Sequence, residues 1–178
     1  TPGYQNLNGD VAEFVVFTGV LPNAERDRVH GYLAHKWGLA SIIPVGNPYK
    51  TTAPLASTKA HFVAKDGTSA PYLDMRVEFR NGIPATDPST LSKYVQYSDM
   101  ALWLDASDGS SVIKDSSNKV SQWADKSGNG VNVSQSDSAK QPTFTASGLN
   151  NLPTLTFDGS NDYLTSSSMD ITQPYSAF

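Results

Sequence analysis

Hydrophobic and polar positions alternate in short runs along most of this chain, and one segment departs from that pattern. Residues 23–37, NAERDRVHGYLAHKW, carry apolar side chains at helical spacing. This stripe consists of Val29, Tyr32, Leu33 and Trp37. Such a stripe predicts an amphipathic helix packed on a sheet. Asn23 is a suitable N-cap for this helix, and Gly38 is a suitable residue to end it.

The segments on either side of the predicted helix have different patterns. DVAEFVVFTGVL, residues 10–21, is apolar without interruption from Phe14 to Phe17, which predicts a strand buried on both faces for part of its length. Pro22 ends that strand. IIPVGNPYKTTAPLASTKA, residues 42–60, contains prolines and little periodicity, so we expect a chain that crosses a surface and continues as a linker.

The region from His61 to Met100 mixes strand and helix signals. HFVAKDG and YLDMRVEFRNG predict two short strands, with turns at Gly67 and at residues 81–82. DPSTLSKYVQY, residues 87–97, predicts one or two helical turns that begin at an Asp-Pro pair.

From Ala101 onward, short apolar runs alternate regularly with turns of Gly, Asn, Ser and Asp. The runs are MALWLDA, VSQWAD, VNVSQ, PTFTA, LPTLTFDG and DYLTSS. Several short strands separated in this way predict an antiparallel β-sandwich over residues 101–165. We expect its large apolar side chains to share one core; these are Trp103, Trp123, Phe144 and Phe157.

Composition narrows the classes of protein. The 178 residues have a net charge of −4, which provides no basic surface for nucleic acid. Cysteine is absent, which excludes disulfides and thiolate zinc sites. No apolar run approaches the roughly 18 residues that a membrane span needs, so we expect no membrane insertion. The first residues, TPGYQNLNGD, lack the features of a signal peptide and an initiating Met. We expect a processed chain or a piece of a longer protein.

Two sets of motifs resemble one known family. ALWLDASD, VSQWADKSGNGVNVSQ and LPTLTFDGSNDYL resemble the opening of a concanavalin A-like, LamG-type jelly-roll domain, as found in bacterial and phage surface proteins. NGDVAEFVVFTGVL, GYLAHKWGL and NPYK resemble the end of the same kind of domain. The resemblance covers roughly residues 8–50 and 101–178. It implies an all-β fold, an antiparallel jelly-roll β-sandwich, with one packed α-helix at residues 23–37.

The order of these motifs implies a particular domain organisation. Residues 1–50 would form the C-terminal strand and helix of one jelly roll, residues 51–100 a linker with short strands, and residues 101–178 the N-terminal half of a second. The alternative is a circular permutation in which both halves share one sandwich. The family's middle strands are missing between the halves, which favours the junction of tandem domains.

Two positions depart from the family pattern. Pro22 stands where the pattern has a Ser or Thr N-cap ahead of a Glu, so the capping box is lost and Asn23 has to serve alone. Asn47 replaces the usual His of the HPYK motif, so no role of that His is carried over to this chain.

Concanavalin A-like folds include glycoside hydrolases as well as lectins, so the carboxylates have to be compared with a catalytic pair. A glycosidase needs two carboxylates at a controlled separation. In the laminarinase-like branch the catalytic carboxylates lie on one strand as Glu-x-Asp-x-x-Glu. This chain has no such spacing, because its three glutamates, Glu13, Glu25 and Glu78, are far apart. His30, His35 and His61 have no spacing typical of a metal site. We therefore expect a protein that is not an enzyme.

The FDGSNDY segment offers oxygen ligands close together after a predicted strand. Related jelly rolls often bind calcium on such loops, so the resemblance implies a calcium site at Asp158, Asn161 and Asp162. The favoured alternative is that Asp158 and Asp162 accept hydrogen bonds from turn amides and fix the loop. Asp125 has the same two interpretations, with the structural one favoured. The three tryptophans are interpreted as core residues rather than sugar platforms.

The resemblance implies a non-catalytic, extracellular or cell-surface module that binds carbohydrate or mediates adhesion, as a fragment of a larger tandem-domain protein. Glycans would be its partners, and the sequence assigns no carbohydrate-binding residue. The alternative is a structural virion protein of a phage, as a tail-fibre, neck or decoration component. Its partners would then be other protein subunits of the particle.

Overall fold

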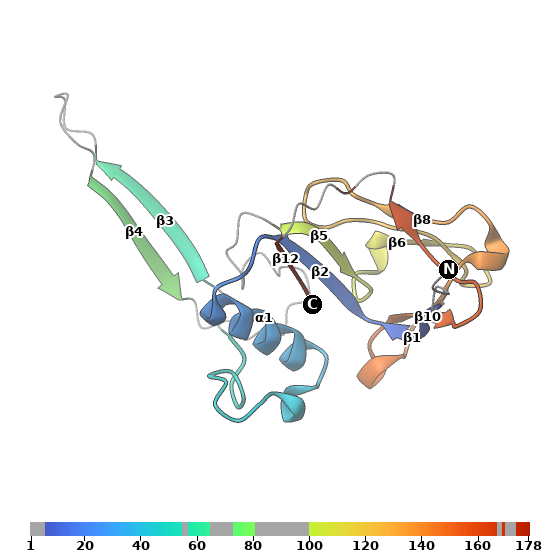
Figure 1. Cartoon of the computed structure of the whole chain (residues 1–178), viewed down its shortest axis with the longest axis horizontal. Helices are drawn as coiled ribbons and strands as arrows, with labels where there is room; N and C mark the ends of the chain where they lie inside the picture. Colours follow the sequence, from blue (N-terminus) through green and yellow to red (C-terminus); the bar gives the residue numbers. More distant parts are fainter. Residues whose placement is uncertain (1–5, 55–56, 65–72, 81–99, 167–168, 170–173) are drawn as a thin grey trace.

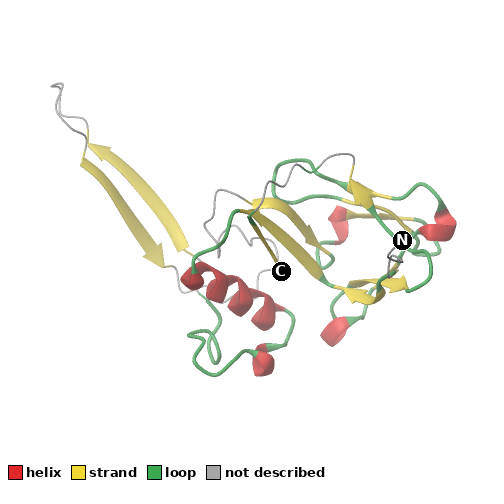
Figure 2. Cartoon of the chain, viewed as in Figure 1, coloured by secondary structure: helices red, strands yellow, loops and turns green. Residues whose placement is uncertain are grey.

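Antiparallel β-strands and one α-helix form the described part of this protein (Figures 1 and 2). A computed structural model describes residues 6–54, 57–64, 73–80, 100–166, 169 and 174–178. Three sheets form the body of the molecule, and a fourth sheet of two strands projects from it. Within the described ranges, no helix is both long enough and apolar enough to cross a membrane.

The first sheet carries the helix and is named here the helix-side sheet. Its strand order is β12-β2-β5, with β12 at Tyr175–Ala177, β2 at Glu13–Thr18 and β5 at Met100–Asp105. The helix α1, Asn23–Lys36, packs on one face of this sheet. The helix-side core between them consists of Val15, Phe17, Leu21, Val29, Tyr32 and Trp103.

The other two sheets enclose a second core beyond β2 and β5. One has the order β1-β10-β9, with strands at Asn8–Val11, Thr154–Asp158 and Thr143–Thr145. The other has the order β11-β8-β7-β6, with strands at Thr165–Ser166, Val133–Ser134, Val120–Trp123 and Val112–Lys114. The far core, as it is named here, consists of Val16, Leu102, Leu104, Ala106, Val112, Val120, Trp123, Leu155 and Phe157.

A two-stranded hairpin projects from the body (Figure 1). It pairs β3, Ser57–Ala64, with β4, Leu73–Arg80, in antiparallel register. This confirms the two short strands predicted for this region. The predicted turns at Gly67 and residues 81–82 and the helical turns at residues 87–97 lie outside the described residues.

The helix at residues 23–37 is confirmed, as is its C-terminal signal. Gly38 has a φ of 69°, its N–H reaches the carbonyl of His35, and the N–H of Leu39 donates to the carbonyl of Ala34. These two bonds form a Schellman motif. The N-cap prediction is wrong, because Pro22 is the cap and Asn23 is the first helical residue. Pro22 has no acceptor side chain, so its carbonyl alone receives the N–H groups of the first turn.

Two predictions for residues 101–165 have different outcomes. Antiparallel β-structure is confirmed, and the helical segments in that range are three-residue 3₁₀ turns; these are η2, Gly109–Ser111, η3, Ser138–Lys140, and η4, Leu149–Asn151. The prediction of one shared core is wrong, because Trp103 lies in the helix-side core whereas Trp123 and Phe157 lie in the far core. Phe144 packs against the far core. Neighbouring positions of β5 point to opposite faces, and both faces of this strand are covered.

The tryptophans are core residues, as the sequence indicated. Trp37 and Trp103 each retain 3% of their surface and Trp123 retains 2%. None of them presents a ring face to solvent for sugar stacking. An aromatic platform on this protein has to come from another residue type.

Segments from before residue 20 and from residue 100 onward share the same sheets. β2 pairs with β5 along Glu13↔Asp105 to Val16↔Leu102, and β1 pairs with β10 along Asn8↔Asp158 to Val11↔Leu155. The circularly permuted alternative would have this arrangement. The division at residues 50 and 101 stays a prediction.

This pairing predicts that the body survives a cut in the connecting chain. A protease site inserted between β4 and β5 should yield two fragments that co-elute in size exclusion without denaturant, because β2 and α1 bury their apolar surface on β5. A Val15→Asp variant, cut in the same way, should separate into two peaks. Independent elution of the wild-type fragments would contradict this packing.

Candidate functional site

A buried carboxylate lies where β2, α1 and β5 meet. The side chain of Glu13 is 1% exposed, and four side-chain donors surround it. Its Oε1 accepts from Trp103 Nε1 at 2.8 Å and from the Tyr32 hydroxyl at 3.3 Å. Its Oε2 accepts from Lys36 Nζ and from Trp37 Nε1, each at 2.8 Å. Each carboxylate oxygen of Glu13 therefore accepts two hydrogen bonds.

The charges continue from Glu13 into a chain of ion pairs. Lys36 Nζ lies 2.9 Å from Asp105 Oδ1, and Asp105 Oδ2 lies 3.0 Å from Lys126 Nζ. Lys126 also lies 3.0 Å from Asp108 Oδ2, at the more exposed end. We name these five residues the charge cluster. It holds three carboxylates against two ammonium groups.

Burial and pairing shift the pKa values of Glu13, Asp108 and Lys126. Burial raises the pKa of Glu13, the Lys36 ammonium opposes that effect, and the neighbouring Asp105 reinforces it. Burial alone would lower the pKa of Lys126, but its bonds to Asp105 and Asp108 outweigh burial and raise that pKa. The Ser110 hydroxyl and Lys126 hold the pKa of Asp108 below its usual range.

Asp125 has a structural role in the WADKSGNG loop. Its Oδ1 accepts from the N–H groups of Trp103 and Ser127, at 3.0 and 2.8 Å, and its Oδ2 accepts from the Ser127 hydroxyl and the Val131 N–H. Gly128 and Gly130 have φ values of 95° and 73°, as expected for a turn that needs positive φ. These bonds attach the loop to the free edge of β5 and support the structural interpretation of Asp125.

The predicted calcium ligands lie together on the turn after β10. Asp158 Oδ1 accepts from the N–H groups of Ser160, Asn161 and Asp162, and Asp162 Oδ2 accepts from the Asp158 N–H at 3.1 Å. These contacts are those of the turn-forming alternative. The second oxygen of Asp162, Oδ1, is buried and has no hydrogen-bond partner.

No metal centre is evident in the described ranges. They contain no group of three or more His, Cys, Asp or Glu side chains arranged to hold a metal ion. His30 packs edge-on against the Phe178 ring, whereas His35 Nε2 lies 2.8 Å from the Tyr49 carbonyl. Calcium at Asp158, Asn161 and Asp162 stays a prediction.

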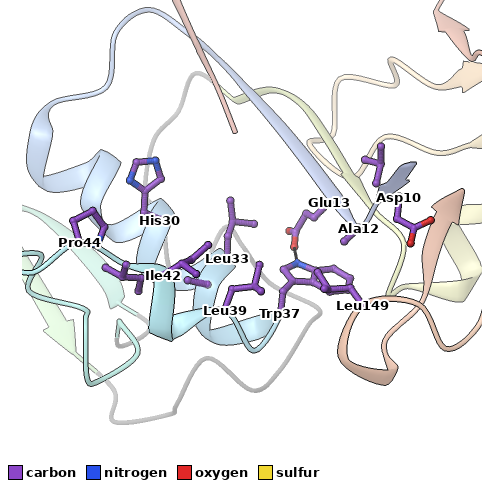
Figure 3. Close-up of a pocket in the computed structure, with 13 residues that line it drawn as sticks. Asp10, Ala12, Glu13, His30, Leu33, Trp37, Leu39, Ile42, Pro44 and Leu149 are labelled. Carbon is purple, nitrogen blue, oxygen red and sulfur yellow. Dashed lines mark hydrogen bonds between the residues drawn. The ribbon is translucent and has the colours of Figure 1, made fainter. Parts of the chain in front are cut away.

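An apolar pocket of about 400 Å³ adjoins the charge cluster. One wall is a stripe at i, i+3, i+4 and i+7, formed by His30, Leu33 and Ala34 of α1 and by its C-cap Trp37. The other walls are the β1–β2 segment, the residues around the 3₁₀ turn η1, Ala40–Ile42, and Leu149 of η4. Figure 3 shows the helix residues and Asp10 on different sides of the pocket.

Sequence reasoning did not predict the pocket or the charge cluster. Two signals were present: a single Glu within an apolar strand, and a helix stripe that continues past the core positions to His30 and Ala34. A lone charge in a buried strand requires a partner. The partner residues are distributed over three elements, and their convergence is visible only in the fold.

Comparison of the chain with family models, with curated proteins and with solved structures found no match.

Breaking the buried ion pair should destabilise the protein strongly. Glu13→Gln keeps the shape but turns an amide N–H₂ toward one pair of donors, so we expect a loss of about 3 kcal/mol in the free energy of unfolding. Lys36→Met should lower the free energy of unfolding by a similar amount. The loss in the double variant should be smaller than the sum of the two single losses, by at least about 1 kcal/mol. Urea denaturation of the wild type, the two single variants and the double variant measures these free energies of unfolding.

The exposed pair Lys140–Asp137 provides the matched control for this cycle. Asp137→Asn should leave the urea midpoint nearly unchanged, because solvent screens exposed ion pairs. Additive effects of Glu13→Gln and Lys36→Met would contradict a direct coupling of these side chains.

Asp125 should make stability depend on acid pH. Burial alone would raise the pKa of Asp125, but hydrogen bonds from Ser127, Trp103 and Val131 outweigh burial and lower it. A depressed carboxyl pKa stabilises the fold above the unfolded value of about 3.9, and this contribution is lost as the pH falls through the folded pKa. We expect Asp125→Asn to be less stable at neutral pH and to lose less stability on acidification. Parallel pH profiles of the two proteins would contradict this role.

Proposed function

We propose that this chain belongs to a non-catalytic carbohydrate-binding or adhesion module with a concanavalin A-like jelly-roll fold, within a larger extracellular or cell-surface protein of tandem domains. The predominantly antiparallel β-structure and the single packed helix support the fold. The LWLDA, WADKSGNG and FDGSNDY motifs support the family resemblance.

One observation carries the binding proposal. Tyr163 is 45% exposed and directly follows the turn that carries Asp158 and Asn161, both of which are exposed. An aromatic ring that stacks on a sugar and neighbouring oxygen and amide groups that bond to its hydroxyls form a sugar-binding surface. The turn bonds of Asp158 hold this loop in one shape, so the surface is formed before a ligand arrives.

The carboxylate geometry supports a binding role rather than glycoside hydrolysis. Both oxygens of Glu13 accept hydrogen bonds within the charge cluster. Asp105 is fully buried and pairs with two lysines. A hydrolase needs its carboxylates on either side of a bound sugar, and the cluster encloses these two within the protein.

A structural virion component is the second candidate, because open sheet edges can pair with other subunits. Among the described strands, β1 and β12 are two of those that pair with a neighbouring strand on one side only. Open strand edges are templates for pairing with another chain. In that role the module would act as a spacer or contact between protein subunits.

Substitution of Tyr163 tests the glycan proposal. On a glycan array the wild-type protein should bind a defined set of sugars, and Tyr163→Ala should weaken binding about tenfold, since stacking on an aromatic ring contributes roughly 1 kcal/mol or more. Tyr175→Ala is the matched control, because Tyr175 is 46% exposed but lies on β12. It should bind as the wild type does.

Each binding measurement should be repeated with calcium and with a chelator. If the chelator weakens glycan binding by the wild type but not by Asp162→Ala, calcium binds at this loop. Equal weakening by Tyr163→Ala and Tyr175→Ala would contradict the proposed surface. Absence of binding to every glycan would favour the virion function.

A further inference from the structure

We propose that the pocket beside α1 binds a small amphiphilic amine, with its apolar body against the helix stripe and its ammonium group at Asp10. This site is separate from the Tyr163 surface and does not depend on the glycan proposal. The volume of the pocket, the chemistry of its walls and the distribution of charge around it carry the inference.

The walls of the pocket suit an apolar body. Its volume of about 400 Å³ is within the range of small-molecule sites, which are mostly apolar with a few polar groups. Trp37 and Ile43 are buried beneath it, and Ile42 and Pro44 are exposed at its margin. The remaining apolar wall residues are Val11, Ala12, Leu33, Ala34, Leu39 and Leu149.

The charges around the pocket select a cation over an anion. Among the described residues that line it, the ionisable ones are Asp10, Glu13 and His30, and none is Lys or Arg. The Lys36 ammonium pairs with Glu13 and Asp105, and the Lys50 ammonium donates to the carbonyls of Ser41 and Ile43 beside the η1 wall. The described wall residues therefore offer an anion no Lys or Arg side chain, whereas Asp10 offers a cation an exposed carboxylate.

Asp10 is the group that an ammonium can reach. It is exposed, and within the described residues no cation pairs with it. Its Oδ1 accepts from the Thr156 hydroxyl at 2.6 Å, which fixes the carboxylate beside the pocket. Asp10 and His30 lie on opposite sides of the pocket (Figure 3), so the apolar walls lie between the carboxylate and the imidazole.

Three probes with the same chain length separate charge from hydrophobicity. Titration with n-octylamine, n-octanol and n-octanoate, followed by amide chemical shifts of the full chain, should show binding in that order of affinity. Octylamine should bind about fivefold more tightly than octanol, which corresponds to one ion pair at contact in water. The largest shifts should fall on Leu33, Leu39 and Ile42.

Two aspartate variants test the position of the ammonium group. Asp10→Asn keeps an acceptor for Thr156 and should reduce octylamine affinity to that of octanol. Asp137→Asn changes the net charge equally but lies on the distant η3 turn, and it should bind octylamine as the wild type does. Ile42→Ser, at the exposed margin, should weaken octylamine and octanol together.

Four results would overturn the proposal. They are the absence of octylamine binding to the folded wild type, equal affinity for octanoate, equal weakening by Asp10→Asn and Asp137→Asn, and shifts that fall outside the pocket. The amide spectrum of each variant also reports whether it is folded, so a loss of binding is not confused with unfolding.

Discussion

The carboxylate of Glu13 is the interaction on which the arrangement of helix and sheet depends. A charge placed in the interior is tolerated only when its hydrogen-bonding capacity is filled. Glu13 receives two indole N–H groups, a phenol and an ammonium, from α1, its C-cap and β5. Each donor has one correct position, so the carboxylate fixes both the rotation of α1 and its height above the sheet. Apolar contacts alone would allow the helix to slide.

The same constraint explains why β5 can be covered on both faces. Trp103 lies toward the helix and donates to Glu13, while Leu102 and Leu104 lie toward the far core. The free edge of β5 is closed by the 125–129 loop, where Asp125 accepts the Trp103 N–H and Asn129 donates to the carbonyls of Met100 and Ala101. A strand buried on two faces and closed along its edge has little access to other chains.

Local sequence patterns predicted the helix and the strands well. They could not predict which elements pack against each other. The helix stripe and Gly38 predicted α1 and its end, because both signals act within a few residues. The single-core prediction failed at Trp103, because alternation along β5 shows that neighbours face opposite ways but not which faces are covered. The N-cap failed by one residue, since the carbonyl of Pro22 accepts the first-turn N–H groups without a side chain.

The candidate sites divide in the same way. The turn role of Asp158 could be predicted because it bonds to residues two to four positions away. Asp10 could not be identified, because it lines a pocket with Leu149 and bonds to Thr156, which are remote in sequence. A residue whose neighbours come from other elements has no local signature of its role.

The pairing of β1 with β10 has a consequence for how this protein reaches its structure. Asp10 and Thr156 are 146 positions apart, so this contact has a very high contact order and its formation closes almost the whole chain into a loop. Hairpins such as β6–β7 are local, so we expect them to form early. We expect β2, which carries Glu13, to join late, because Glu13 and its partner Trp103 are 90 positions apart. Until it does, β5 offers an unpaired edge flanked by Leu102 and Leu104. We therefore expect the chain to be most prone to aggregation in the interval before β2 covers this edge.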